Sequence, residues 1–182
     1  MKIAEEQFTL QDGRTVTIRS AEERDAEAML AYVRKTSEET HYLIRYPEEI
    51  SFTLEQEHQI IGDILRSEDS AWLTVFDGDR AVGNCSISRC SGQLKVRHRC
   101  NLAIALEQAY CGLGLGTKLL SKARDTAKEL GFEQLELGVY ADNERAIAAY
   151  KKAGFREYGR LPRAFRLKDG TYIDEINMVL FL

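Results

Sequence analysis

Three glycines at alternate positions have the spacing of a phosphate-binding turn. Gly112, Gly114 and Gly116 follow the apolar run 101–106 and precede a segment with helical periodicity. Glycine has no Cβ, so a bulky anion can approach consecutive backbone NH groups in a turn that other residues disfavour. The helix that follows would direct its free NH groups and the positive end of its dipole at the same anion. A tight strand-to-helix turn without a ligand has the same signature, so the ligand must be argued from the rest of the chain.

Two other phosphate-binding motifs do not fit this spacing. A dinucleotide-binding turn would need glycine at Thr117 and a first glycine directly after the strand, whereas Glu107–Cys111 intervene. A nucleoside triphosphate loop would need Gly-Lys-Ser or Gly-Lys-Thr, and the chain has Gly-Thr-Lys at 116–118. Glu136 stands twenty residues after Gly116, the distance of a ribose ligand, but the alternation of a strand explains it better.

A second pair of residues with chemical potential stands further along the chain. Asn143 and Tyr150 are seven residues apart, which is two helical turns, so they lie on the same face of a helix. Asn143 has the residue type of an N-cap, and Tyr150 alone fits a tyrosine packed in a core.

The elements that position these residues alternate along the chain. Period-two patterns predict strands, and apolar residues three and four apart predict helices. The predicted strands are 15–19, 71–76, 80–88, 95–106, 134–140, 155–167 and 171–182; the predicted helices are 22–34, 54–66, a helix from the glycines to Leu130, and 143–153. A long polar and aromatic loop is expected at Thr36 to Ser51. The fold class is therefore α/β (α+β): a mixed, mostly antiparallel sheet of about seven strands with about four helices and a parallel pair beside the glycine turn.

Bulk composition narrows the class of protein. The 182 residues suit a single domain, 1–182, and 44% apolar residues can bury a sizeable core. A net charge of -4 argues against broad nucleic-acid binding. No apolar run is long enough for a bilayer and the first residues lack a secretion signal, so we expect a cytoplasmic protein that binds no membrane. Four cysteines without a C-x-x-C pair and three scattered histidines predict no metal site.

Three segments together resemble the GNAT superfamily of acyl-CoA-dependent N-acyltransferases: Asn101–Leu106, Gly112–Thr117 and Leu137–Phe155. Their order and separation match the family, and the resemblance covers nearly the whole chain. The C-terminal run 154–182 looks similar to the polyamine and ribosomal-protein acetyltransferase branches. A homodimer is compatible with this resemblance and is not derivable from the residues.

The resemblance implies a role for each segment. The pyrophosphate of coenzyme A would be held by the backbone of Gly112, Leu113, Gly114, Leu115, Gly116 and Thr117. The pantetheine amides would hydrogen-bond the strand edge at Ile104, Ala105 and Leu106, and an amide NH there would stabilise negative charge on the thioester oxygen. Asn143 would contact the cofactor or cap its helix, and Tyr150 would return a proton to the leaving thiolate.

The chain departs from the family pattern at two positions. Cys111 stands where the family usually has Gln or Arg, which removes a side-chain contact to phosphate but keeps the backbone donors. Cys111 as a nucleophile would need a base that the sequence does not place nearby, and direct transfer needs no covalent intermediate. Asn101 stands where an acidic residue is often found, and the nearest titratable residue is His98, which also fits a plain exposed strand histidine. No general base is therefore assigned.

The acceptor remains open at this point. Four loop glutamates would attract a cationic amine or simply form a solvated face: Glu38, Glu39, Glu48 and Glu49. Tyr42 and Tyr46 would line an amine pocket, whereas three arginines would hold a carboxylate: Arg45, Arg163 and Arg166. The sequence thus predicts transfer of an acetyl group from acetyl-CoA to a small-molecule or peptide primary amine in a ternary complex. The alternative is a non-catalytic acyl-CoA-binding regulatory module.

Overall fold

Eight strands form one sheet in the order β1-β2-β3-β4-β5-β6-β8-β7 in the computed structural model, which describes residues 1–182. The strands are β1 Glu6–Thr9, β2 Thr15–Arg19, β3 Ser70–Asp77, β4 Arg80–Arg89, β5 Arg99–Leu106, β6 Gln134–Tyr140, β7 Arg156–Arg166 and β8 Tyr172–Phe181. The α-helices are α1 Ala26–Glu39, α2 Leu54–Arg66, α3 Leu115–Glu129 and α4 Glu144–Lys152. Neighbouring strands are antiparallel except for β5 and β6.

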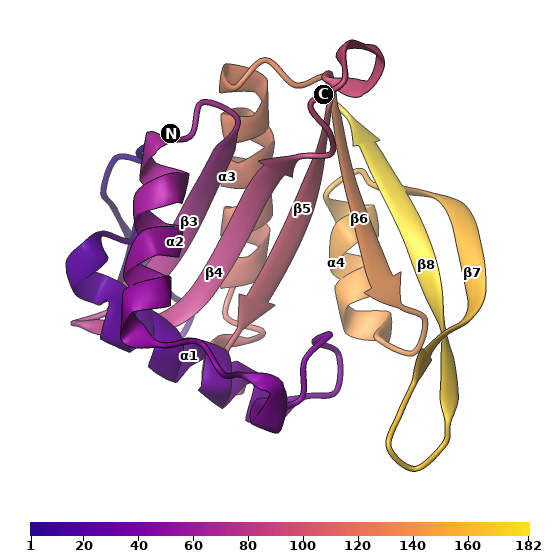
Figure 1. The fold of residues 1–182 in the computed structure, drawn as a ribbon, viewed down its shortest axis with the longest axis horizontal. Coiled ribbons are helices and arrows are strands. Elements are labelled where there is room, and N and C mark those ends of the chain that lie inside the picture. The colour runs from indigo at the N-terminus through magenta and orange to yellow at the C-terminus, as the bar shows by residue number, and fades with distance from the viewer.

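Helices cover both faces of the sheet. Helices α1 and α2 lie on one face, in front of β3 and β4 in Figure 1, and α3 and α4 lie behind the sheet. The larger core cluster packs α3, through residues such as Leu119 and Ala123, against the strands. A smaller cluster, which contains Met29, Tyr32 and Ile61, packs α1 and α2 on the opposite face. Because burial of these apolar faces drives the packing, the position of each strand relative to α3 and α4 is fixed.

The parallel pair separates along its length. Strands β5 and β6 are paired only at Arg99 with Gln134, Cys100 with Leu135, and Asn101 with Glu136. After Asn101 the two strands diverge toward their carboxyl ends (Figure 1). The sheet is therefore open between β5 and β6, with α4 behind β6.

The predicted fold class is confirmed, with differences in the elements. The additional eighth strand is β1, four residues that pair with β2 and are too short to show a clear period. The strand predicted from Lys95 begins at Arg99, because residues Leu94–Val96 form a 3-10 turn.

Helix α1 begins at Ala26 rather than at Glu22, because Glu23–Asp25 form a 3-10 turn, and it ends five residues later than predicted, so the following loop is shorter. The helix continues to Glu39, so residues 36–39 are helical rather than part of the loop. Thr36 is buried there, and its hydroxyl donates to the carbonyl oxygen of Tyr32 at 2.9 Å within the same helix. This bond satisfies the polar group that made the segment look like a loop.

Two further observations concern the membrane and metal predictions made from the sequence. None of the helices combines the length and the apolar character needed to cross a lipid bilayer. All four cysteines are free, and no group of three or more His, Cys, Asp or Glu side chains is arranged to hold a metal ion.

Candidate functional site

A pocket of about 820 Å³ occupies the opening between β5 and β6. Its walls come from both faces of the sheet: Thr117, Leu120 and Tyr150 from α3 and α4, and Thr40, Tyr42 and Leu43 from the end of α1 and its loop. Nine of the predicted site residues line it: Ile104, Ala105, Leu106, Gly112, Gly114, Gly116, Thr117, Asn143 and Tyr150. The pocket therefore connects the two sides of the sheet through its one parallel junction.

The glycine turn uses two of its three glycines for their backbone freedom. Gly112 and Gly114 have φ angles of +78° and +86°, which side chains rarely adopt, and Gly114 is the N-cap of α3. Gly116 already lies within the first helical turn and has no positive φ. The NH groups of residues 115–117 have no acceptor inside the helix, since Lys118 is the first to bond back, to Gly114 at 3.1 Å. The helix entrance therefore presents free donors to the pocket.

Leu113 and Leu115, which were predicted with the glycines, do not line the pocket. Leu115 is fully buried in the core, and Leu113 packs against the same cluster. The Leu113 carbonyl accepts from the backbone N of Gln11 at 3.2 Å, which holds the turn to the β1–β2 connection. These two residues shape the turn, and only their backbone is available to a ligand.

Arg145 lies beside the glycine turn and was not singled out from the sequence. A Cβ placed on Gly112 would be 3.2 Å from one terminal nitrogen of Arg145, so the guanidinium borders the turn. Arg145 is the only lysine or arginine that lines the pocket. It stands two residues after Asn143, in the first turn of α4. Its position next to the predicted N-cap is the sequence feature that could have identified it. Arg145 therefore places a cation beside the glycine turn that follows Cys111, and supplies it from the first turn of α4.

Cys111 itself is half-buried, and burial raises the pKa of its thiol; Arg145 lowers that pKa by a smaller effect. The sulfur lies 4.0 Å from the carbonyl oxygen of Leu106. A thiol with a raised pKa is a poor nucleophile near neutral pH.

The edge of β5 presents alternate residues to the opening. Glu107 N donates to Val82 O at 3.0 Å, and Arg99 O accepts from Cys90 N at 3.1 Å, so the odd-numbered residues direct their backbone toward β4. The Ala105 carbonyl also accepts from the Tyr32 hydroxyl at 2.9 Å. Consequently Ile104 and Leu106 direct their NH and C=O groups into the pocket, whereas Ala105 directs its own toward β4.

Helix α4 holds the two predicted polar residues in different environments. The side-chain oxygen of Asn143 accepts from Ala146 N at 3.2 Å and caps the helix. Tyr150 is 8% exposed, and its hydroxyl makes no hydrogen bond within the chain. The structure contains no fully buried side-chain oxygen without a hydrogen-bond partner. Since the Tyr150 hydroxyl has no partner, it is not sealed in the core and is open to the pocket. Burial raises the pKa of Tyr150, which keeps the phenol protonated near neutral pH.

Aromatic rings form the other end of the pocket. Tyr140 stacks on Phe165 with ring centroids 3.7 Å apart, and Tyr42 meets Tyr140 edge-on at 5.8 Å. The Tyr42 hydroxyl donates to the Asp142 carbonyl at 3.3 Å, which fixes the loop after α1 over this end. Glu175 of β8 is the only carboxylate among the lining residues.

The residues predicted to attract an acceptor are mostly engaged elsewhere. Glu39 accepts from Gln108 N at 2.7 Å, Glu49 accepts from Tyr46 N at 2.8 Å, and Glu48 is paired with Lys168. Glu38 is exposed and does not line the pocket.

The remaining polar candidates also lie outside the pocket. Arg45 is placed over the Phe52 ring, and Arg163 and Arg166 over the Tyr172 ring. His98 accepts through its carbonyl from Glu133 N at 2.9 Å, at the closed end of the β5–β6 junction, and does not line the pocket.

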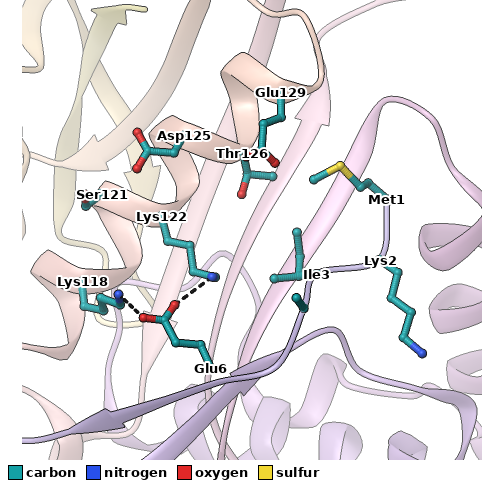
Figure 2. Close-up of a pocket in the computed structure, with 11 residues that line it drawn as sticks. Met1, Lys2, Ile3, Glu6, Lys118, Ser121, Lys122, Asp125, Thr126 and Glu129 are labelled. Carbon is teal, nitrogen blue, oxygen red and sulfur yellow. Dashed lines mark hydrogen bonds and ion pairs between the residues drawn. The ribbon is translucent and has the colours of Figure 1, made fainter.

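A second hollow lies between the N-terminal segment and α3 (Figure 2). It measures about 500 Å³ and is lined by Lys2 and by two lysines of α3, Lys118 and Lys122. Both side chains point toward Glu6, which pairs with each of them. Glu6 pairs with both of these lysines, and Asp125 and Glu129 also line the hollow, so nearby carboxylates offset much of the positive charge that would attract a phosphate.

Comparisons with known proteins agree on one family. A family model described as "Acetyltransferase (GNAT) family" matches residues 19–155. A structure of a GNAT-family acetyltransferase from Streptococcus pneumoniae is 28% identical, covers 92% of this chain and 99% of that one, and superposes with a TM-score of 0.87. A structure of ribosomal-protein-alanine N-acetyltransferase from Brucella melitensis is also 28% identical, with 91% and 99% coverage and a TM-score of 0.78.

A curated relative matches over a shorter stretch. The mycothiol acetyltransferase of Corynebacterium efficiens is 32% identical over 98 residues, which are 50% of this chain and 32% of that protein. The chain therefore spans about a third of the length of that relative.

Proposed function

The chain belongs to the acetyltransferase (GNAT) family, and from that premise we propose that it transfers an acetyl group from acetyl-CoA to a primary amine. The observation that carries the proposal is the pocket that crosses the sheet between β5 and β6. It has hydrogen-bond donors that suit a phosphate on one side, and a wall of aromatic rings with one carboxylate on the other. Such a passage lets two substrates enter from opposite faces and meet.

The residues beside the glycine turn fit the diphosphate of coenzyme A. The free NH groups of 115–117 and the Arg145 guanidinium provide both backbone and side-chain donors for an anion. Ile104 and Leu106 would hydrogen-bond the amides of the pantetheine arm as an added strand. Asn143 acts as a helix cap, and its place in the lining supports a contact to the same arm.

The acetyl thioester supplies an activated carbonyl, and the protein would lower the barrier at two atoms. A backbone NH of Ile104 or Leu106 would donate to the carbonyl oxygen as negative charge develops there. Tyr150 would donate its phenolic proton to the departing sulfur. The phenol carries its proton at neutral pH, because its usual pKa of 10 is raised further by burial. Transfer is direct in this scheme, and Cys111 forms no covalent intermediate.

Thermal unfolding with acetyl-CoA, followed by release of free CoA thiol with a panel of amines, tests the proposal. We expect acetyl-CoA to raise the melting temperature and at least one amine to be turned over. The Tyr150→Phe variant should keep the acetyl-CoA shift and lose about 10²-fold or more in kcat. Stabilisation by acetyl-CoA without release of thiol with any amine would instead identify a non-catalytic acyl-CoA-binding module.

The acceptor is proposed only as a primary amine of a small molecule or a peptide. The related proteins carry names of both kinds, mycothiol and ribosomal-protein alanine. No arginine or lysine lies on the aromatic side of the pocket, which favours an acceptor without a required carboxylate.

A further inference from the structure

We propose that Glu175 binds the ammonium group of the acceptor and takes its proton before the amine attacks the thioester. This inference rests on the proposed function and supplies the general base that the sequence did not reveal. An amine with a pKa near 10 is protonated at neutral pH and cannot attack until it loses a proton.

Glu175 lies on the acceptor side of the sheet. In β8 its neighbour Ile176, and Met178 further along, point into the core cluster that contains α3. Side chains alternate between the faces of a strand, so Glu175 projects to the opposite face. It is half-buried, opposes Tyr140 of β6 in register, and lines the pocket with Tyr42 and Phe165.

Gly138 has no side chain and so leaves room for the Glu175 carboxylate over β6. A Cβ placed on Gly138 would lie 2.8 Å from Cδ and 3.3 Å from Cγ of Glu175, so the acid group lies directly over β6. Gly138 has no positive φ, so the backbone does not demand glycine there. A glycine inside a strand marks a close approach, and here the approaching group is Glu175. The side chain thus extends from β8 across β6, the strand that borders the opening.

The carboxylate has no partner within the chain. It makes no ion pair and no hydrogen bond, although most other acids near the acceptor side do. Aromatic rings of Tyr140, Phe165 and Tyr42 surround the same space. A carboxylate flanked by aromatic faces is a suitable receptor for an ammonium ion, since both attract positive charge.

The neighbouring titratable groups leave Glu175 as the candidate base. Tyr140 on β6 and Tyr158 on β7 have pKa values raised mainly by burial, so both stay neutral near pH 7. His41 and Asp142 face the same aromatic group from the loops but contact each other at 3.1 Å. The lining contributes no lysine or arginine on this side to compete for Glu175.

The proposed step balances as follows. The ammonium gives one proton to Glu175, and the freed lone pair forms the C–N bond at the thioester carbon. The C–S bond breaks, the sulfur takes the proton of Tyr150, and the phenolate takes the remaining extra proton from the new amide nitrogen. Glu175 then releases its proton to water, so the products are the acetylated amine, CoA thiol and one proton.

Kinetics of Glu175→Gln with spermidine, lysine amide and a peptide that begins with alanine test the inference. For the amine that the wild-type protein acetylates best, we expect about a 10²-fold loss of kcat/KM at pH 7. The loss should narrow as the pH approaches 10, because an amine that is already neutral needs no base. The melting-temperature shift with acetyl-CoA should be unchanged, which shows that the fold and the cofactor site are intact.

Two further variants separate the effect of the position of the Glu175 carboxylate from the effect of a change in net charge. Gly138→Ala should displace the Glu175 carboxylate and cause a similar loss, with little added effect in the Glu175→Gln background. Glu157→Gln removes an exposed β7 carboxylate with the same change in net charge, and should leave the kinetics as in wild type. A Glu175→Gln variant with wild-type kcat/KM and pH profile would overturn the role of Glu175 alone. A wild-type protein that acetylates none of the amines would overturn the proposed function and this inference together.

Discussion

Arg99 of β5 and Glu136 of β6 form a two-point ion pair where the parallel strands are still joined. The guanidinium donates to both carboxylate oxygens, one of them at 2.6 Å, and the Glu136 side chain is 7% exposed. The pair lies beside the last backbone pairing, Asn101 with Glu136, before the strands diverge. It therefore closes one end of the opening that forms the pocket.

Loss of this pair should lower stability in a pH-dependent way. The hydrogen bond from Arg99 lowers the pKa of Glu136 from its usual 4.5, so its contribution is complete above pH 4.5 and is lost as the pH falls through the lower, folded-state value. We expect Glu136→Gln to reduce the free energy of unfolding by about 1–3 kcal/mol at pH 7, measured by urea unfolding. The difference from wild type should shrink below that folded-state value.

The exposed Arg124–Asp125 pair provides the control for this experiment. Both of its side chains are well exposed, so Asp125→Asn should change the free energy of unfolding by less than about 1 kcal/mol at either pH. Equal effects of the two substitutions at pH 7 would show that Arg99 and Glu136 do not stabilise the junction.

The closed end of the opening also shows what the sequence could and could not predict. The alternation in 134–140 correctly placed Glu136 in a strand, but its partner Arg99 is distant in sequence and was not identified. The glycine turn and the N-cap at Asn143 are local signals, and the sequence alone predicts both.

The features that were missed depend on contacts between distant segments. Arg145 acquires its place from the packing of α4 against the glycine turn, and Glu175 from the pairing of β8 with β6. Gly116 was included in the turn because its spacing matches that of Gly112 and Gly114, although its φ is helical. Periodicity in the sequence predicts which face of a helix or strand a residue occupies, whereas tertiary packing sets the positions of Arg145 and Glu175.

Gly114 and Gly116 should respond in opposite ways to alanine. Gly114→Ala places a side chain at a φ of +86° and 3.5 Å from Gln11 Nε2, which we expect to reduce stability by about 1–2 kcal/mol and to weaken acetyl-CoA binding. Gly116→Ala adds a methyl group within a helix, where its nearest neighbour is 3.9 Å away, and should stabilise the fold by about 0.5–1 kcal/mol. Melting temperatures with and without acetyl-CoA report both quantities. A destabilising Gly116→Ala would place that residue in the strained turn after all.

Arg145 should contribute to cofactor affinity through its charge. We expect Arg145→Ala to weaken acetyl-CoA binding about 10-fold at low salt, because it removes the only lysine or arginine that lines the pocket. The effect should be smaller at high salt, since screening weakens exposed pairs. Lys152→Ala removes an exposed cation from the same helix and should leave the affinity unchanged. Isothermal titration at two salt concentrations distinguishes a local contact from a general effect of charge.

The protonation of Tyr150 gives a prediction for the alkaline side of the rate profile. Burial raises the pKa of this phenol above its usual 10, so the acid form should persist well into the alkaline range. With saturating amine, kcat of the wild-type protein should therefore not decline between pH 7 and 10 through loss of this proton. Tyr150→Phe should have a low kcat across the same range. A wild-type decline with a midpoint below pH 10 that is absent in Tyr150→Phe would mean that the phenol titrates normally, and the burial seen here would not hold with substrates bound.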